Sequence, residues 1–431
     1  MIDLTAALTP WLGAPAWSVA YSGGLDSSVL LHLLSHFARD HATPPLRALH
    51  VHHGLQSAGD AWPAHCQQQC DALGIELTVI HVQVPTGASL EQAAREARYA
   101  AFAQALGAGE VLFTGQHCDD QAETLLFRLL RGAGLRGLTG MPAVRSLGCG
   151  SLVRPLLSVS REQLQQHAHE HGLKWIEDPS NTNTAFSRNF LRHAVLPVVR
   201  QRWPQAVQSL ARTAFHLDEA QGLLDELAIG DLTAAGEGCA VTWLGLESLD
   251  LASLARLSPA RQRNALQFWL TSRTRLPDTR HWAGWESLRD AAGDAQPLWN
   301  LTDGQLQRSH GRIWWLSGDW LAAPGGAQAW IEADLPLALP GNGCVRISGQ
   351  VPQGALHIGY RQGGEVLDVQ GRGRRDLKRL LNEFGVPHFV RSRLPLLYRE
   401  DRLLAVANLP NLGEGDCQLH WQPPTSAQGL S

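Results

Sequence analysis

Long apolar runs, paired cysteines and a secretory leader are all missing from this chain of 431 residues. Because no run of about 18 apolar residues occurs, we expect no transmembrane helix. The N-terminal residues do not form a basic segment followed by an apolar one, so we expect no secretory signal. The seven cysteines are too scattered for a disulfide scaffold and fit a reducing compartment. These absences predict a cytoplasmic protein without a membrane partner.

Positive charge is also in short supply over the chain as a whole. The formal net charge is −4, which argues against a protein that coats nucleic acid with its whole surface. Two segments are nevertheless basic: Pro179–Leu217 holds five arginines and no acidic residue, and Arg372–Arg379 holds five basic residues and one acidic residue. Each segment either contacts RNA phosphates or forms a solvated basic face, and the sequence leaves both interpretations open.

What the chain does have is a phosphate-binding turn near its start. An apolar strand at 17–20 leads into Ser22, Gly23, Gly24, Leu25, Asp26 and Ser27, and an apolar helix follows. Glycines without a Cβ let the backbone close around an oxyanion, to which the helix presents its unpaired N–H groups. Asp26 would repel a bare polyphosphate, so its presence predicts Mg²⁺ between the carboxylate and the phosphates. The alternative is a tight turn in which Asp26 or Ser27 caps the helix.

The residue pattern of this turn excludes two familiar nucleotide-binding motifs. The chain contains no Gly-x-x-x-x-Gly-Lys-Ser/Thr, and its first turn does not read Gly-x-Gly-x-x-Gly. The turn instead resembles the PP-loop of the ATP pyrophosphatases. That superfamily cleaves ATP between the α and β phosphates and uses the AMP part to activate a carbonyl or carboxylate oxygen.

Strands and helices alternate over the first half of the chain. Apolar strands at 17–20, 46–51, 75–82 and 111–114 are separated by helices near 26–37, 61–73 and 89–106. Right-handed crossovers of this kind give an α/β fold with a doubly wound parallel sheet. Ligands of such sheets bind at the carboxyl ends of the strands, so we expect the functional site there.

Composition divides the chain further, because 431 residues with 44% hydrophobic content suffice for two or three packed domains. A long amphipathic helix from Pro204 to about Leu232 leads out of a catalytic domain at 1–215. A tryptophan-rich segment at 216–325 predicts a small, mainly helical middle domain, with a linker at 322–329. Short strands and one helix near 374–384 predict a small β-rich α+β domain at 334–425.

Histidines and arginines flank the expected pocket. His50, His52 and His53 end the second strand, and no acidic or cysteine partner stands nearby in the sequence, which disfavours a zinc site. His52 either packs on a nucleotide base, donates to a phosphate or belongs to a hydrogen-bonded turn. On the next helix, Arg95 and Arg98 either point at substrate or form ion pairs along the helix.

A carboxylate pair follows the fourth strand. Asp120 and Glu123 stand three apart at a helix start, so both point to one side. Beside a nucleotide pocket, two carboxylates can hold an amine or Mg²⁺, or take a proton from an attacking amine. The alternative is a capping pair, with the aspartate at the N-cap and the glutamate at N3. Downstream, Arg131 lies in a glycine-rich loop able to close over phosphate, and Arg188 and Arg192 fit phosphates bidentately.

Taken in order, these segments make the chain similar to the tRNA(Ile)-lysidine synthetase family. The similarity is close over about residues 17–200 and looser through Arg361–Glu365 and the basic stretch 372–379. It rests on seven segments: Ser22–Ser27, His52–Leu55, Ala94–Tyr99, Asp119–Thr124, Arg131–Leu138, Arg154–Leu157 and Asp178–Arg192. The loop alone marks only the superfamily, whereas the ordered set is much more specific.

The resemblance implies a two-step reaction on a tRNA anticodon. ATP adenylates the C2 oxygen of the wobble cytidine in tRNA(Ile) with a CAU anticodon, and pyrophosphate leaves. The amine of free lysine then attacks C2 and displaces AMP. Asp26 would hold Mg²⁺, Asp120 and Glu123 would bind the lysine amine or assist its deprotonation, and Arg188 would be a further catalytic group.

The resemblance also implies contacts with the two large substrates. ATP would contact the loop Ser22–Ser27 together with His52, Arg98 and Arg131. The tRNA would contact Arg192, Arg372, Arg374, Arg375, Lys378 and Arg379. One departure from the family pattern is Gln116, which stands where many members carry histidine, so His117 would have to take over any role of that ring.

Three other functions remain open on the sequence. A tRNA thiolase that uses an iron–sulfur cluster needs close cysteine pairs, but Cys66 and Cys70 are four apart and no second close pair exists. Another PP-loop amide ligase, acting on a small substrate, would leave the basic stretch 372–379 unexplained. A non-catalytic nucleotide- or RNA-binding module need not keep Asp26 and the carboxylate pair together. The oligomeric state does not follow from the sequence, and a homodimer is one state that it allows.

Overall fold

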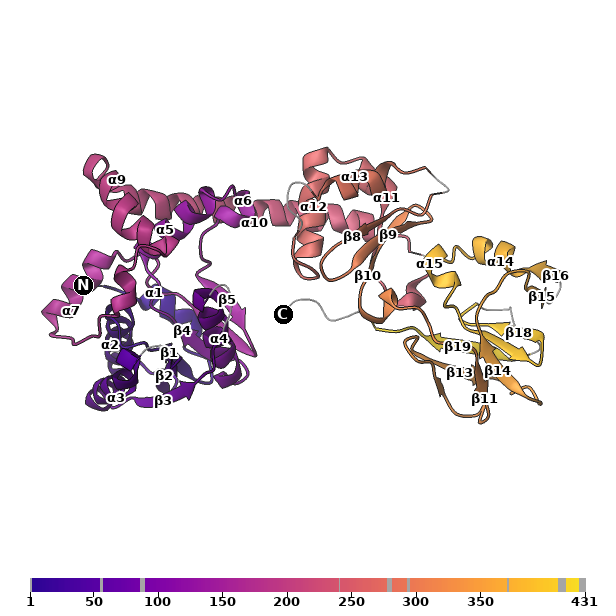
Figure 1. The fold of residues 1–431 in the computed structure, drawn as a ribbon, viewed down its shortest axis with the longest axis horizontal. Coiled ribbons are helices and arrows are strands. Elements are labelled where there is room, and N and C mark those ends of the chain that lie inside the picture. The colour runs from indigo at the N-terminus through magenta and orange to yellow at the C-terminus, as the bar shows by residue number, and fades with distance from the viewer. Residues whose placement is uncertain are drawn as a thin grey trace. The chain divides into compact units, whose positions relative to one another are not determined.

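A computed structural model shows two compact units, Met1–Leu223 and Leu224–Ser431. Figure 1 shows the helices and strands of both units. The structure describes residues 2–54, 57–85, 90–239, 241–276, 281–292, 295–369, 372–409 and 416–425. Within that part of the chain, no helix combines the length and the apolar character that a membrane span requires.

The first unit is built around a six-stranded sheet with the strand order β3-β2-β1-β4-β6-β5. Its strands are β1 Trp17–Ala20, β2 Leu46–His52, β3 Glu76–His81, β4 Val111–Phe113, β5 Val144–Leu147 and β6 Gly150–Val153. All run parallel except β5, which pairs antiparallel with β6 at the edge. The strand order reverses between β1 and β4. The predicted doubly wound sheet is therefore confirmed, and its ligand crevice is expected at this reversal.

The two-residue period of the strands divides the core of this unit into two layers. Val19 and Phe113 belong to a buried cluster with residues of α2 Leu25–Asp40, α3 Trp62–Leu73 and α7 Arg161–Glu170. Leu49 and Leu112 point to the other face, where they pack with Phe102 of α4 Leu90–Ala105. The helices predicted near 26–37, 61–73 and 89–106 are thus present and cover both faces of the sheet.

A second group of helices lies partly between β4 and β5 in the chain and partly after the sheet. It comprises α5 Cys118–Leu129, α6 Leu135–Leu138, α8 Ser187–Phe190, η4 Leu191–Val195, α9 Leu196–Arg202 and α10 Ala206–Gly236. The segment η4 is a π-helical turn, which is wider than an α-helical turn and is often found at functional sites. The long helix predicted from Pro204 to about Leu232 corresponds to α10.

The second unit begins with helices and one antiparallel sheet. Its first helices are α11 Leu251–Ala255, α12 Pro259–Thr271 and α13 Ala283–Asp290. The sheet has the order β7-β10-β9-β8, with β7 Ser248–Asp250, β8 Leu298–Asn300, β9 Gln305–Ser309 and β10 Arg312–Leu316. This part agrees with the predicted helical segment followed by short strands.

The rest of the second unit is rich in short strands. One sheet contains β11 Gln328–Trp330, β14 Leu356–Gly359, β17 Leu396–Arg399 and β18 Arg402–Val406. Another contains β12 Leu337–Ala338, β13 Cys344–Ser348 and β19 Gln418–Gln422, and β15 Val366–Val369 pairs with β16 Gly373–Asp376. The helices here are α14 Leu377–Glu383 and α15 His388–Arg391. The predicted β-rich α+β fold is confirmed.

The second unit has two buried clusters, one within the middle segment and one that joins this segment to the C-terminal strands. Trp314 and Trp320 belong to the same buried cluster as Leu356, Leu377 and Trp421. Strand β11 pairs with β14, so the C-terminal sheet begins inside the segment that the sequence predicts as a linker. The division into domains at 1–215, 216–325 and 334–425 stays a prediction.

Candidate active site

The glycine turn lies between β1 and α2, at the carboxyl edge of the sheet. Gly23 has a φ of +80°, and a Cβ there would lie 2.9 Å from Cys66 Sγ and 3.0 Å from Ile176 Cδ1, so only glycine fits. The backbone N–H of Ser22 donates to Ser27 Oγ at 3.3 Å, and the two serine hydroxyls lie 3.0 Å apart.

The start of α2 is left open to a ligand. Its N-cap residue is Gly24, and no side chain caps it, so neither Asp26 nor Ser27 fills the capping role that was the alternative prediction. A helix N-terminus without a side-chain cap presents its N–H groups and the positive end of its dipole to an anion. The predicted phosphate-binding turn therefore has the geometry that anion binding requires.

The loop after β4 packs directly on this helix start. A Cβ on Gly115 would lie 3.0 Å from the carbonyl carbon and oxygen of Asp26, so the two backbones meet where only glycine allows. This contact brings the second predicted motif, which begins α5, beside the glycine turn.

Asp26 lies in the first turn of α2 and is held by two cationic groups. Its carboxylate oxygens are each 3.4 Å from an Arg161 guanidinium nitrogen, and one lies 3.6 Å from His117 Nε2. Burial raises the pKa of Asp26, but the hydrogen bond and charge of His117, together with Arg161 and Arg192, outweigh burial and lower it. Asp26 is therefore ionised at neutral pH, as a metal ligand must be.

His117 is fully buried and joins the two motifs. Its Nε2 lies 3.6 Å from Asp26 and 3.5 Å from Asp120, and its Nδ1 lies 3.6 Å from Asp119. The Asp119 amide donates to Nδ1 at 3.2 Å, which favours the neutral ring. Burial lowers the pKa of His117, but the hydrogen bonds and charges of Asp119, Asp26 and Asp120 outweigh burial and raise the pKa to about 10.

The start of α5 is capped, but not by the predicted pair. His117 is the N-cap, and the Asp120 carboxylate at N3 accepts a hydrogen bond from the His117 N–H at 3.1 Å. The alternative interpretation from the sequence placed Asp120 at the N-cap and Glu123 at N3. Glu123 takes no part in the cap. Because it stands about one helical turn from Asp120, both carboxylates can make another contact together.

That contact is with Arg192, which comes from the π-helical turn η4. Arg192 Nε donates to Glu123 Oε1 at 2.6 Å, and its terminal nitrogen donates to Glu123 Oε2 and Asp120 Oδ1, each at 3.0 Å. The Glu123 side chain is only 4% exposed. Burial raises the pKa of Glu123, and Arg192 opposes this only in part.

Asp119 is a site residue that the sequence reasoning did not single out. Its carboxylate accepts from the backbone N–H of Arg161 at 2.8 Å and from the guanidinium of Arg200. Burial raises the pKa of Asp119, but His117 and then Arg161 and Arg200 lower it well below its usual range. The only signal for Asp119 in the sequence was its position next to Asp120. The three-residue spacing indicated Asp120 and Glu123 instead.

Three predicted ATP contacts make other interactions in the described part of the chain. His52 Nε2 lies 3.5 Å from Asp60, and its ring packs against His81 with a centroid distance of 5.2 Å. Arg98 lies 5.9 Å from the centre of the Tyr99 ring. Arg131 lies 5.0 Å from the centre of the Phe127 ring and lines a pocket. Their roles toward ATP, and that of Arg188 in catalysis, stay predictions.

The predicted RNA contacts divide into two groups. Arg192 forms ion pairs with Asp120 and Glu123. The other five are exposed at the start of β16, along it and on α14, namely Arg372, Arg374, Arg375, Lys378 and Arg379. One of them, Arg372, donates to Glu383 at 2.8 Å. Their role toward tRNA stays a prediction.

The donor set around Asp26 fits magnesium only if the substrate completes it. Among the residues that the structure describes, no three histidine, cysteine, aspartate or glutamate side chains are arranged to hold a metal ion. Mg²⁺ keeps several waters and commonly binds through one or two carboxylates plus substrate phosphates. An ionised Asp26 beside an open helix start meets that requirement.

Three known domain families match the chain in order. A PP-loop domain matches residues 2–199, the TilS substrate binding domain matches 249–314, and the TilS substrate C-terminal domain matches 356–421. A tRNA(Ile)-lysidine synthase of Pseudomonas putida is 70% identical over 98% of this chain and 99% of its own length. The chain belongs to the tRNA(Ile)-lysidine synthase family. The family resemblance drawn from the seven segments is thereby confirmed.

Other members of the family support the same assignment over the full chain. The tRNA(Ile)-lysidine synthase of Pseudomonas fluorescens is 62% identical over 98% of this chain and 96% of its own length. That of Pseudomonas aeruginosa is 59% identical over 99% of this chain and 98% of its own length. Both units of the structure are therefore shared with the family.

Proposed function

We propose that this chain joins free lysine to C2 of the wobble cytidine of tRNA(Ile) bearing a CAU anticodon. The reaction consumes ATP, passes through an adenylated tRNA, and releases pyrophosphate and AMP to form lysidine. The observation that carries the proposal is the bridge made by His117, which lies 3.6 Å from Asp26 of the PP-loop helix and 3.5 Å from Asp120 of the carboxylate pair. A nucleotide site and an amine site are thus neighbours.

In the first step, the glycine turn and the uncapped start of α2 bind the triphosphate, and their N–H groups stabilise negative charge on the phosphate oxygens. Asp26 would hold Mg²⁺, which would neutralise further phosphate charge when bound. The C2 oxygen of cytidine attacks the α phosphorus, the bond to the bridging oxygen breaks, and pyrophosphate leaves. The cytidine must leave the stack of the anticodon loop to reach this pocket.

In the second step, Asp120 and Glu123 bind the amine of lysine and accept its proton. The raised pKa of the buried Glu123 suits a general base. The amine nitrogen forms a bond to C2, the bond from C2 to the adenylate oxygen breaks, and AMP leaves with the electron pair. Arg192 donates hydrogen bonds to both carboxylates and so orients them until the amine arrives.

The basic stretch on β16 and α14 supports a second region of RNA contact. Its exposed cations lie in the segment that the TilS substrate C-terminal domain matches. We propose that these side chains bind tRNA phosphates away from the anticodon. The cytoplasmic location, the three-domain division and a homodimeric state stay predictions.

The test is lysine incorporation into a panel of unmodified tRNAs. We expect radiolabelled lysine to enter tRNA(Ile) with a CAU anticodon, with one AMP released per lysine, and not to enter elongator tRNA(Met) with the same anticodon. ADP as the product would contradict the PP-loop chemistry. Transfer of sulfur without lysine would indicate a thiolase, and ATP binding without turnover on any tRNA would indicate a non-catalytic module.

A further inference from the structure

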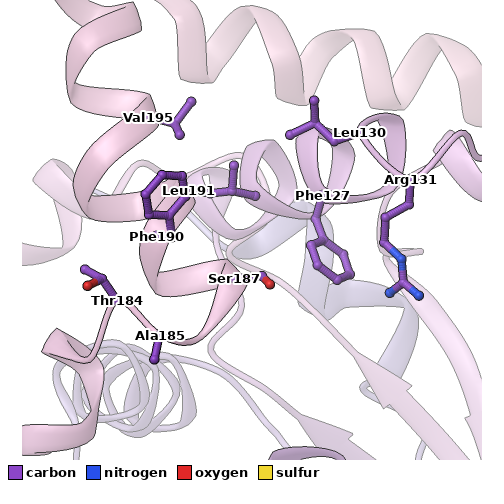
Figure 2. Close-up of a pocket in the computed structure, with 9 residues that line it drawn as sticks. All are labelled: Phe127, Leu130, Arg131, Thr184, Ala185, Ser187, Phe190, Leu191 and Val195. Atoms are coloured by element: carbon purple, nitrogen blue, oxygen red, sulfur yellow. The ribbon is translucent and has the colours of Figure 1, made fainter.

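A pocket of about 460 Å³ lies in the first unit and takes no part in the two steps above. One wall comes from the end of α5 and the other from α8 and η4, as Figure 2 shows. Its lining includes Phe127, Leu130, Arg131, Ser187, Phe190 and Leu191.

Both walls of the pocket continue directly into the carboxylate site. Phe127 follows Glu123 by four residues, which is about one turn of α5. Leu191 immediately precedes Arg192, and Arg192 donates to Glu123 Oε1 at 2.6 Å. The pocket and the Arg192–Glu123 ion pair therefore lie on the same two elements, about one helical turn apart along α5.

The lining of the pocket is apolar and open to solvent. Phe190 is 50% exposed and Leu130 is 72% exposed, whereas most large apolar side chains of this unit are buried. Contiguous exposed apolar side chains usually mark a binding surface. Arg131 already stacks on the Phe127 ring at 5.0 Å, so a cation stands next to an aromatic face.

The surroundings of the pocket are cationic. Arg131 lines the pocket itself. The segment Pro179–Leu217, which supplies one wall, has five arginines and no acidic residue, and two of them, Arg192 and Arg200, pair with carboxylates of α5. Aromatic faces beside phosphate-binding cations are how proteins hold unstacked bases of single-stranded RNA.

We propose that this pocket receives an unstacked base of the anticodon loop, next to the wobble cytidine, while Arg131 binds its phosphate. The inference rests on the proposed function, because it requires the loop to enter the carboxylate site. Phe190 and Phe127 supply the stacking surface. Holding a neighbouring base fixes how deeply the loop enters, so the pocket positions C2 of the cytidine and contributes to substrate specificity.

Substitutions of Phe190 test the stacking surface. Phe190→Ala is expected to raise the KM for tRNA about tenfold, within the range that loss of one stacked base produces. The KM for lysine should not change, and Phe190→Trp should retain normal kinetics. The matched control is Phe186→Ala, because Phe186 is 39% exposed on the same segment but does not line the pocket. A merely structural effect of Phe190→Ala would lower the melting temperature and raise both KM values.

Photo-cross-linking gives a readout that does not depend on activity. A photoreactive base is placed at each loop position that flanks the wobble cytidine, and the adducts on the full chain are mapped. We expect one of these positions to label Phe127 or Phe190, and the label to disappear in Phe190→Ala. Labelling only elsewhere overturns the inference, as does a rise in the KM for lysine with an unchanged KM for tRNA, which would indicate an amino-acid pocket.

The two proposals fail in distinguishable ways. If the wild-type chain forms no lysidine on any tRNA, the proposed function fails. If it forms lysidine and Phe190→Ala behaves like Phe186→Ala, only the base pocket fails.

Discussion

At the residue scale, one buried imidazole holds the charges of the site together. His117 lies within 3.6 Å of the carboxylates of Asp26, Asp119 and Asp120. Arg161, Arg192 and Arg200 supply the remaining positive charge from other elements. Buried ions are tolerated only when paired in this way, so each carboxylate here depends on partners from distant parts of the chain.

Asp26→Asn tests the role of the ionised carboxylate beside the glycine turn. It should lower the rate of tRNA adenylation at least about 100-fold, because charge stabilisation at the phosphates is lost. The release of pyrophosphate in the presence of tRNA and ATP measures this step. Asp40→Asn, at the exposed end of the same helix, is the control and should behave as wild type. Adenylation near the wild-type rate in Asp26→Asn would remove the metal assignment.

Glu123→Gln separates lysine binding from a structural role. Loss of a charge-assisted hydrogen bond to the lysine amine should raise the KM for lysine about 10- to 100-fold, while adenylation continues. Steady-state kinetics with lysine and burst measurements of pyrophosphate give the two quantities. The exposed Glu96→Gln on α4 serves as the control. A lowered melting temperature with an unchanged KM for lysine would show that Glu123 only anchors Arg192.

At the scale of elements, α2 and α7 meet through four histidines. His32 and His36 stand one turn apart on α2, and His167 and His171 stand one turn apart at the end of α7. His32 Nδ1 lies 3.1 Å from His167 Nε2, and the ring centroids of His32 and His171 are 4.8 Å apart. Burial, followed by the charges of the other three rings and Arg39, lowers the pKa of His32 to about 4.

This cluster predicts that the first unit loses stability in mild acid. The unfolded chain protonates His32 below its ordinary pKa of about 6.5, whereas the folded chain resists protonation down to about 4, so stability falls as the pH drops through that window. A comparison of pH 7 with pH 5 should therefore show a loss of stability, which solvent screening keeps below the full value of the pKa shift. Glu170 partly offsets the repulsion at His167.

Native-state hydrogen exchange of the β1 amides at the two pH values measures this loss within the first unit. His32→Gln should flatten the pH dependence. His216→Gln, at an exposed position on α10 where the ring pairs with Glu219, should leave it unchanged. An equal slope in all three proteins would contradict the role of the cluster.

The elements predicted from the sequence are those in which apolar residues recur with a clear period. The strands β1 to β4 are apolar and their helices amphipathic, so their positions followed from local pattern. The hairpin of β5 and β6 was not predicted, because its strands are short and contain polar residues and glycine. His117 was not expected as an N-cap, because histidine is not a favoured capping residue.

The contents of the site were predicted less completely than its place. The glycine turn, Asp26, Asp120 and Glu123 were identified from spacing, and the structure brings them together. The pairing of Arg192 with Glu123 was not predicted, because it depends on a π-helical turn at Leu191–Val195 that has no local sequence signal. A tertiary interaction of this kind overrides what a segment's own pattern indicates.

At the scale of the whole molecule, we expect the basic residues of β16 and α14 to contribute a part of the tRNA affinity that depends on salt concentration. Arg374→Glu or Arg375→Glu should weaken tRNA binding and reduce the slope of log Kd against log salt by about one for each phosphate that is no longer bound. Filter binding over a salt series measures both. The control is Arg346→Glu, an exposed arginine on β13 that gives the same change in net charge. Equal effects of all three variants would show only a general influence of net charge.

The common core of the second unit limits how this protein can be divided. Trp314 and Trp320 precede the stretch that looks like a linker, yet they pack with Leu356 and Trp421 beyond it. A chain cut near residue 325 would leave apolar surface exposed on both fragments, and such fragments aggregate or are degraded. A protease should therefore spare this stretch while the unit stays folded.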